Sequence, residues 1–332
     1  MQAKQLGKVM IYSTGGAGIN VGSFFTKFRE ENPAAGFAEM QAVYIDTSMS
    51  NIWNRPEIKS EDVYLLEDMD GSGKVRAENY REISERINDM LLKFPPADLN
   101  IVLSSTSGGS GSVIAPSLAS ELLKRERNVV VAAIASTDSR IEIENSVKTL
   151  KSYEAISQLR EQPVVMLYYE NNKENQRTEV NTSVRNDIVK LAALFSRQNK
   201  ELDSADLRNW LNYSKVTKAE PRLVLLDFAN GPVESARSQI LTVATLAYEG
   251  TNTNIGSAVD YQCVGYIAEE NKNSIQLTGP NHYLIVDGRI IDVYSHLANE
   301  LGRIDELNAA KKRTVKSIVD GNDKVQNDGL VI

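Results

Sequence analysis

The amino-acid sequence predicts an α/β fold in which a doubly wound parallel sheet forms a nucleotide-binding domain. A long connecting helix, a smaller mixed α/β domain, a C-terminal helix and an acidic tail are expected to follow. Three observations support this prediction. Apolar runs alternate with helical patterns in the first half of the 332 residues, two of these runs end in glycine-rich loops, and the alternation changes after residue 169. Such alternation is typical of a parallel sheet covered by helices on both faces.

Six apolar runs in the first half are predicted to be strands, and the helical patterns lie between them. Several runs are apolar throughout, as strands buried on both faces by helices tend to be. Strands are expected at 9–12, 42–46, 63–66, 101–104, 129–135 and 164–169, and helices at 21–31, 77–93, 114–125 and 143–159.

The second half begins with the long connecting helix, expected at 182–199, whose apolar residues fall on one face. A short helix at 204–211 follows. The smaller domain is expected to hold strands at 223–228, 261–268, 274–277 and 283–286, a helix at 233–248, and then a last helix at 292–317. The predicted division is a nucleotide-binding domain at 1–180, the connecting helix at 181–199, the smaller domain at 200–290, the C-terminal helix at 291–317 and the tail at 318–332.

Composition excludes several classes of function. The net charge of −7 argues against direct nucleic-acid binding. No apolar run approaches the length of a membrane span, so we expect a cytoplasmic protein without a membrane partner. The single cysteine, Cys263, allows no internal disulfide and no thiolate cluster. His282 and His296 lack metal-ligand spacing, so no metal site built from side chains is predicted.

Two glycine-rich loops each follow a predicted strand and precede a predicted helix. Glycine lets the backbone turn tightly and bring its N–H groups close to a ligand, and the helix start adds partial positive charge. Together these features suit a phosphate; the alternative is a pair of plain Ser/Gly turns. The first loop contains Gly15, Gly16, Ala17, Gly18 and Asn20, and the second contains Ser107, Gly108, Gly109, Ser110, Gly111 and Ser112.

Two common nucleotide motifs fit these loops poorly. The P-loop needs serine or threonine after its Gly-Lys pair, but Gly73 and Lys74 are followed by valine. The dinucleotide fingerprint GxGxxG could use two glycines of the first loop, but it meets Val21 where its third glycine belongs. Asp46, at the end of the next predicted strand, could still serve as the acid that binds a ribose. An NAD-type oxidoreductase therefore remains an alternative.

The pair of loops resembles that of the tubulin/FtsZ family, in which GGxGxN opens the nucleotide site and GGGTG[ST]G grips the phosphates. Here Ser107 and Ser110 replace the first glycine and the central threonine, and Val113 follows where a further glycine is usual. These departures, together with the C-terminal Asp-Gly-Leu-Val-Ile, resemble the phage-encoded branch of the family. By order of elements, the resemblance covers nearly the whole chain.

A third match follows the predicted connecting helix. Residues 199–206 resemble the family's catalytic loop, NxDxxD/E, with Asp203 and Asp206 at the two acids and Glu201 where asparagine is usual. The resemblance implies that these acids polarise the attacking water from the next subunit, so that hydrolysis requires assembly. The alternative is local: Asp203 is a natural N-cap for the short helix, and Asp206 is an acid favoured in the first turn.

The resemblance also implies GTP or GDP as the ligand, with Mg²⁺ beside the phosphates. Residues 71–73 resemble the γ-phosphate loop, and residues 136–139 the loop beside the ribose. Asn181 is our choice for the guanine contact and Asn186 is its competitor, since an amide both donates and accepts. The implied nucleotide-binding residues are Gly15, Gly16, Ala17, Gly18, Asn20, Asp46, Gly71, Ser72, Gly73, Ser107, Gly108, Gly109, Ser110, Gly111, Ser112, Glu144, Asn171 and Asn181.

The C-terminal tail combines charge with an apolar end. Its acidic residues could bind a basic surface of a neighbouring subunit and its last residues could anchor there, although composition alone also permits a solvated terminus. We expect the tail to lie along the next subunit. The residues concerned are Asp320, Asp323, Asp328, Leu330, Val331 and Ile332.

The function implied by the resemblance is GTP hydrolysis coupled to head-to-tail polymerisation into dynamic cytoskeletal filaments. These filaments would position phage DNA in the cytoplasm of an infected bacterium. The implied partner is the chain itself, through the catalytic loop and the tail, with phage adaptor proteins as further candidates. Two alternatives from other classes remain open: the NAD-type oxidoreductase and a nucleotide-binding scaffold without catalysis.

Overall fold

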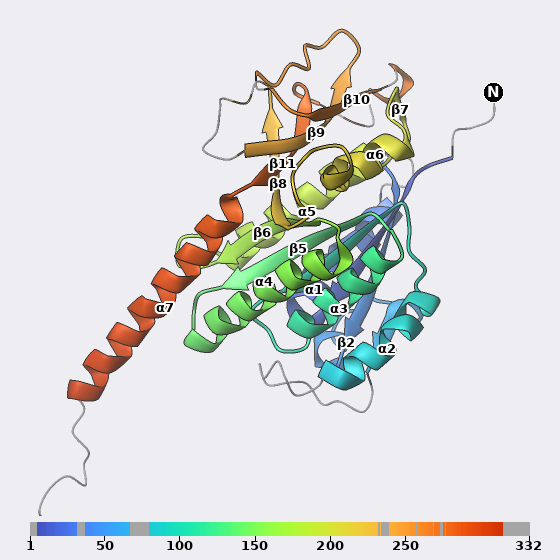
Figure 1. The fold of residues 1–332 in the computed structure, drawn as a ribbon. Coiled ribbons are helices and arrows are strands. Elements are labelled where there is room, and N and C mark those ends of the chain that lie inside the picture. The colour runs from blue at the N-terminus through green and yellow to red at the C-terminus, as the bar shows by residue number, and fades with distance from the viewer. Residues whose placement is uncertain are drawn as a thin grey trace, which may run out of the picture.

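The computed structural model describes residues 5–31, 37–66, 80–231, 233, 239–256, 258–267, 269–272, 275 and 277–314. Within these residues, eleven strands form one sheet in the order β3-β2-β1-β4-β5-β6-β8-β11-β9-β10-β7 (Figure 1). The strands are β1 (Lys8–Thr14), β2 (Glu39–Asp46), β3 (Val63–Leu65), β4 (Leu99–Ser105), β5 (Val129–Ser136), β6 (Val164–Asn171), β7 (Asn199–Lys200), β8 (Leu223–Asn230), β9 (Gln239–Tyr248), β10 (Tyr261–Ile267) and β11 (Asn281–Asp287).

The predicted doubly wound parallel sheet is confirmed. All neighbouring pairs among β1 to β6 run parallel. The core residues of α1 and α5 pack with one face of the sheet, and those of α2, α3, α4 and α7 pack with the other. The helices are α1 (Gly15–Glu31), α2 (Tyr80–Lys93), α3 (Gly111–Lys124), α4 (Arg140–Arg160), α5 (Arg177–Leu194), α6 (Ser204–Leu211) and α7 (Arg289–Thr314).

The connecting helix is α5, which begins and ends about five residues earlier than predicted. Asn199 and Lys200 instead form β7, which pairs antiparallel with β10. Just beyond α5, the carbonyl of Ser196 accepts the N–H of Gly7 at 3.1 Å, at the start of β1. The helix therefore ends beside the amino end of β1, the edge of the sheet opposite the glycine-rich loops.

The helix predicted at 233–248 is wrong, because residues 239–248 form β9. This strand lies between β11 and β10 and its apolar residues are buried on both faces. A continuous apolar run cannot be assigned to helix or strand by periodicity alone. Here Ile240, Thr242, Val243 and Thr245 supply the β-branched side chains that favour a strand.

The sheet continues from the first half of the chain into the second. Parallel pairing of β6 with β8 joins residues 164–166 to 223–225. The next strand, β11, runs antiparallel to both β8 and β9, and β9 pairs parallel with β10. The mixed sheet of the second half is thus confirmed, while the division of the chain into domains stays a prediction. The predicted γ-phosphate loop at 71–73, residues 274 and 276 of the strand expected at 274–277, and the tail at 318–332 lie outside the described residues.

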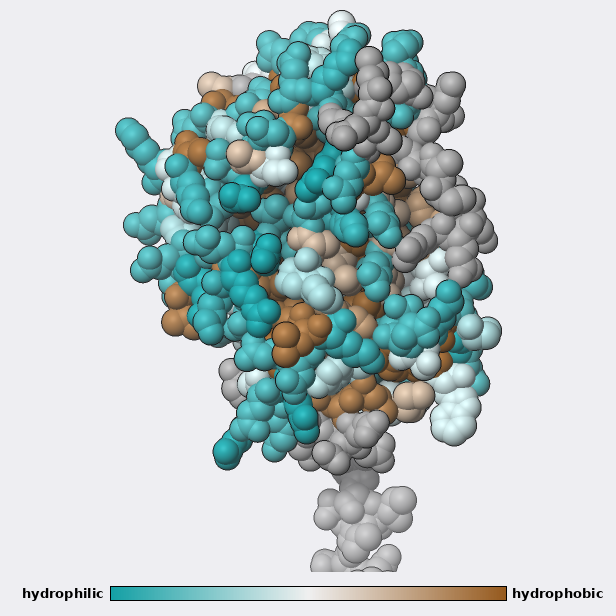
Figure 2. Space-filling view, turned by 90° about the vertical axis from the view of Figure 1, so that its right-hand side faces the viewer, coloured by the Kyte–Doolittle hydropathy of each residue, from teal (hydrophilic) through white to brown (hydrophobic). Residues whose placement is uncertain are grey.

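The last helix, α7, packs along α4 and buries Leu297 completely, and its C-terminal half extends away from the sheet (Figure 1). Figure 2 shows one side of the molecule, on which hydrophobic residues form small groups among hydrophilic ones. In the described part of the chain, no helix combines the length and apolar character that crossing a membrane demands.

Candidate nucleotide site

The two glycine-rich loops lie against each other at the carboxyl edge of the parallel sheet. Gly15 has a φ of +66°, a conformation that residues with a Cβ rarely adopt. A Cβ on Gly15 would lie 3.0 Å from the backbone nitrogen of Gly111 in the second loop. The two loops therefore form one surface, at the edge where doubly wound sheets bind ligands.

The first loop is the first turn of α1 rather than a separate loop. The helix begins at Gly15, so the early N–H groups of the turn have no partner within the helix. A Cβ on Gly18 would lie 2.4 Å from the carbonyl oxygen of Leu103, so glycine is needed for α1 to pack this closely on β4. The loop residues thereby face the edge with their backbone donors, as phosphate binding requires.

Side-chain hydrogen bonds hold the second loop in place. Ser112 Oγ donates to the carbonyl oxygen of Gly109 at 2.9 Å, and Asn145 Nδ2 donates to that of Ser107 at 3.1 Å. Ser110 Oγ lies 2.6 Å from Thr47 Oγ1, which joins the loop to the segment after β2. Ser110, one of the two serines that depart from the family pattern, therefore helps to fix the loop through its side chain. Helix α3 begins directly behind the loop at Gly111.

Asp46 ends β2 beside this loop and is almost fully buried. Its Oδ2 accepts from Asn51 Nδ2 at 2.7 Å, and its Oδ1 accepts from the backbone N–H of Thr47 at 2.8 Å. Burial raises the pKa of the carboxyl group, partly opposed by these hydrogen bonds. A cation beside the carboxylate would offset the free-energy cost of burying its charge. The carboxylate of Asp46 and the hydroxyls of Thr47 and Ser110 are oxygen ligands that Mg²⁺ can bind, together with phosphates and waters.

Asn20 is held from two sides by arginines that sequence analysis missed. Arg55 Nη2 donates to Asn20 Oδ1 at 2.7 Å, and Arg185 Nη2 donates to the backbone carbonyl of Asn20 at 3.3 Å. The Arg185 guanidinium also lies 4.9 Å from the ring centre of Phe24. Burial, followed by the charge of Arg55, lowers the pKa of Arg185. Since Oδ1 is already engaged, the Nδ2 donor is the group of Asn20 left to face a ligand.

The three candidate asparagines beyond Asn20 differ in exposure. Asn171 ends β6, and its buried Oδ1 has no hydrogen-bond partner among the described residues. Asn181 is buried in the first half of α5, whereas Asn186 is exposed and follows Arg185 directly. Arg185, the neighbour of Asn186 along α5, contacts Asn20.

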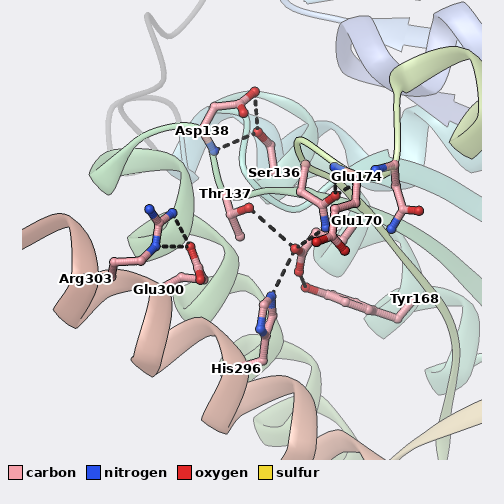
Figure 3. Close-up of polar contacts among 11 residues, drawn as sticks. Ser136, Thr137, Asp138, Tyr168, Glu170, Glu174, His296, Glu300 and Arg303 are labelled. Atoms are coloured by element: carbon pink, nitrogen blue, oxygen red, sulfur yellow. Dashed lines mark hydrogen bonds and ion pairs between the residues drawn. The ribbon is translucent and has the colours of Figure 1, made fainter.

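Glu170 anchors a second group of polar contacts that sequence analysis missed. It lies near the end of β6, and side chains from the loop after β5, the loop after β6 and α7 surround its carboxylate (Figure 3). Thr137 Oγ1 and Asn172 Nδ2 donate to its Oε1 at 3.4 and 3.1 Å, and His296 Nε2 of α7 lies 3.0 Å from the same atom. A cavity of about 580 Å³ lies between the ribose-side loop and α7. Glu144 is half-buried on α4, where Arg140 pairs with it at 3.2 Å.

Asp203 and Asp206 begin α6 and form a capping box. Asp203 Oδ1 accepts the N–H groups of Ala205 and Asp206 at 2.7 and 3.0 Å, and Asp206 Oδ2 accepts the N–H of Asp203 at 3.1 Å. The N–H of Asp206, followed by that of Ala205, lowers the pKa of Asp203. The local alternative, a helix cap, is therefore realised in the structure. The cap is compatible with catalysis, because Asp203 is exposed and Asp206 is partly exposed, although Asp206 Oδ1 also accepts from the Tyr261 hydroxyl at 3.2 Å.

The acids and the phosphate loops lie at opposite ends of α5. This helix starts after β6, at the edge that carries both loops, and its 18 residues span about 27 Å. It ends beside the amino end of β1, and β7 and α6 follow there (Figure 1). Within one chain, Asp203 and Asp206 cannot reach a phosphate bound at the glycine-rich loops.

Comparison with known proteins agrees with this arrangement. Residues 8–177 match the Tubulin/FtsZ family, GTPase domain. Phage tubulin-like proteins of the Pseudomonas phages phiKZ and PhiPA3 are 29% and 27% identical to the chain. Each alignment covers 98% of this chain, with 98% and 99% of the respective relative.

Solved structures show the same fold. The phage tubulin PhuZ with GDP superposes with a TM-score of 0.83 at 21% identity, and a protofilament of TubZ from bacteriophage PhiKZ with 0.80 at 27% identity. Each covers 98% of this chain and 99% of the other. The matched GTPase domain spans just over half of the chain. Its two glycine-rich loops lie side by side. The comparisons do not favour the alternative of an NAD-type oxidoreductase. The chain therefore belongs to the tubulin/FtsZ family of GTPases, with GTP and GDP as the family's ligands.

Proposed function

We propose that this GTPase assembles head to tail, with each active site completed between two consecutive subunits. The observation that carries the proposal is the separation of the acids from the phosphate loops along α5. In a head-to-tail contact, the α6 end of one subunit meets the nucleotide edge of the next. Such a contact is heterologous, so it extends into a filament without closing.

The division of the site has a physical reason. Hydrolysis requires a water held in line with the γ-phosphate, and Asp203 and Asp206 can polarise that water. Two carboxylates beside the phosphates in the resting site would repel them. Supplying the acids from a neighbour separates GTP binding from hydrolysis and makes hydrolysis depend on assembly.

The nucleotide contacts that we propose follow from the geometry of the edge. Backbone donors of residues 15–18 and 108–111 would bind the phosphates, and Asn20 Nδ2 and the partly exposed side chain of Asn171 would meet polar groups of the nucleoside. Exposure favours Asn186 over Asn181 for the guanine contact. Asp46, Thr47 and Ser110 present the oxygen donors for Mg²⁺, which would neutralise charge on the phosphates.

The cellular role that we propose is positioning of phage DNA by filaments in the host cytoplasm, with phage adaptor proteins as further partners. Relatives provide the support: curated relatives are phage tubulin-like proteins, and solved relatives include a protofilament and a filament. The tail at 318–332 is proposed to bind the next subunit.

The dependence of phosphate release on protein concentration tests the proposal. Turnover per subunit should rise from near zero at high dilution to a plateau, in step with the fraction of protein that sediments with GTP. A turnover per subunit that stays constant over the whole concentration range would contradict a shared site. A chain that binds GTP but releases no phosphate at any concentration would instead be a scaffold.

A further inference from the structure

We infer that Trp53 is an anchor of the contact between consecutive subunits, on a turn whose position depends on the nucleotide site. The inference rests on the proposed head-to-tail assembly and names a residue of its interface. Trp53 is 80% exposed, the largest exposed fraction among the large hydrophobic side chains of the described residues. Met49, in the same turn, is also exposed.

Backbone hydrogen bonds and a buried side chain hold the turn that carries Trp53. The N–H groups of Ile52 and Trp53 both donate to the carbonyl of Met49, at 2.9 and 3.0 Å, and the N–H of Arg55 donates to that of Ile52 at 3.0 Å. Ile52 itself is buried in the core beside α1. Trp53 thus projects into solvent from a fixed backbone. Preorganisation of this kind lowers the entropy cost of binding.

The same turn is tied to the nucleotide edge on both sides of Trp53. Asn51 donates to the Asp46 carboxylate, and its side chain packs on Gly16, where an added Cβ would lie 2.8 Å from Asn51 Oδ1. Arg55 donates to Asn20 at 2.7 Å and to Ser23 Oγ at 3.2 Å. Groups that would contact Mg²⁺ and the nucleoside therefore hold the turn from both ends.

A second copy of this chain is the occupant that these positions favour. Trp53 lies in the segment that follows β2 at the carboxyl edge of the sheet, and this segment contacts the first glycine-rich loop through Asn51 and the second through Thr47. In the proposed assembly, this edge receives the α6 end of the next subunit. Tryptophan is enriched among residues that dominate the energy of protein interfaces. An exposed indole next to the bound nucleotide would be covered when the next subunit adds its acids.

The first test compares Trp53→Ala with Leu159→Ala, which removes another large side chain, 70% exposed, on α4. Sedimentation with GTP should show a critical concentration raised about tenfold or more for Trp53→Ala, as expected for a hot-spot residue. Leu159→Ala should match the wild type. The turnover of Trp53→Ala per subunit should reach the wild-type plateau at correspondingly higher concentration, with GTP affinity of the dilute protein unchanged.

Tryptophan fluorescence gives an independent reading, because the chain has two tryptophans and the other, Trp210, is fully buried. The difference between the emission of wild type and that of Trp53→Phe gives the fluorescence of Trp53. In sedimented polymer, and only there, this fluorescence should shift to shorter wavelength and resist quenching by acrylamide. Wild-type assembly with an unshifted, quencher-accessible Trp53 would overturn the inference, as would equal critical concentrations for Trp53→Ala and wild type. Wild-type turnover that is independent of concentration would instead overturn the proposed function.

Discussion

At the scale of single residues, contacts between positions far apart in sequence hold the nucleotide edge together. Gly15, Asp46 and Asn20 lie at this one edge of the sheet. Arg55, Arg185 and Glu170 were missed because their partners are remote in sequence: Arg185 and Asn20 are 165 positions apart, and His296 and Glu170 are 126 apart. No local pattern marks such contacts, which only the fold creates.

The capping box separates two roles of Asp203 that substitution can distinguish. Asp203→Ala should lower the free energy of unfolding through loss of the N-cap, and it should also abolish assembly-dependent hydrolysis. Asp203→Asn keeps a good cap, so its stability should match the wild type while hydrolysis is still lost. Chemical denaturation and phosphate release measure the two effects. Wild-type turnover in Asp203→Asn would show that the carboxylate acts only as a cap.

His282 should make stability sensitive to acid. It is fully buried on β11 with Nδ1 2.9 Å from Thr245 Oγ1, and burial lowers its pKa below the ordinary value of about 6.5. The unfolded chain then binds the proton more tightly, so the free energy of unfolding should fall as pH drops through about 6.5. Urea titrations of wild type and His282→Gln across this range measure the effect. An identical pH dependence in the two proteins would contradict it.

At the scale of elements, prediction succeeded where hydrophobic pattern and loop signals agreed. The six strands of the first half match to within three residues at either end. Prediction failed at β9, where an apolar run buried on both faces carries no periodicity, and at the end of α5, where 199–200 pair with β10. Both errors arise because tertiary contacts, rather than local preference, decide the structure of those segments.

The helix α7 offers a matched pair of leucines for testing its packing. Leu297 is fully buried in the part of the core that α4 and the sheet share with α7. Leu307, further along the same helix, is half-exposed. Leu297→Ala should lower the free energy of unfolding by about 2–5 kcal/mol, and Leu307→Ala by no more than about 0.5 kcal/mol. Urea denaturation compares them. Equal small effects would show that α7 does not pack on the core in solution.

At the scale of the whole molecule, one continuous sheet and one long helix place the glycine-rich loops and the α6 acids at opposite ends. We propose that each end is half of an active site, with backbone donors for the phosphates at the nucleotide edge and carboxylates at the α6 end. The resemblance in the order of elements already implied this arrangement. The structure adds the length of α5, about 27 Å, which lies between the glycine-rich loops and the acids. The account's central claim is that neither end hydrolyses GTP without the other end of a second copy.

Mixing two complementary variants tests that claim most directly. Asp206→Asn should bind GTP but not hydrolyse it, because the cap is kept and the carboxylate is lost. Gly15→Ala should keep its acids but lose GTP binding, because the new Cβ displaces the backbone of Gly111. Each variant alone should release almost no phosphate. The account predicts that their mixture regains turnover, because the acids of Gly15→Ala subunits complete sites that hold GTP in Asp206→Asn subunits. A mixture that co-sediments yet remains inactive would contradict it.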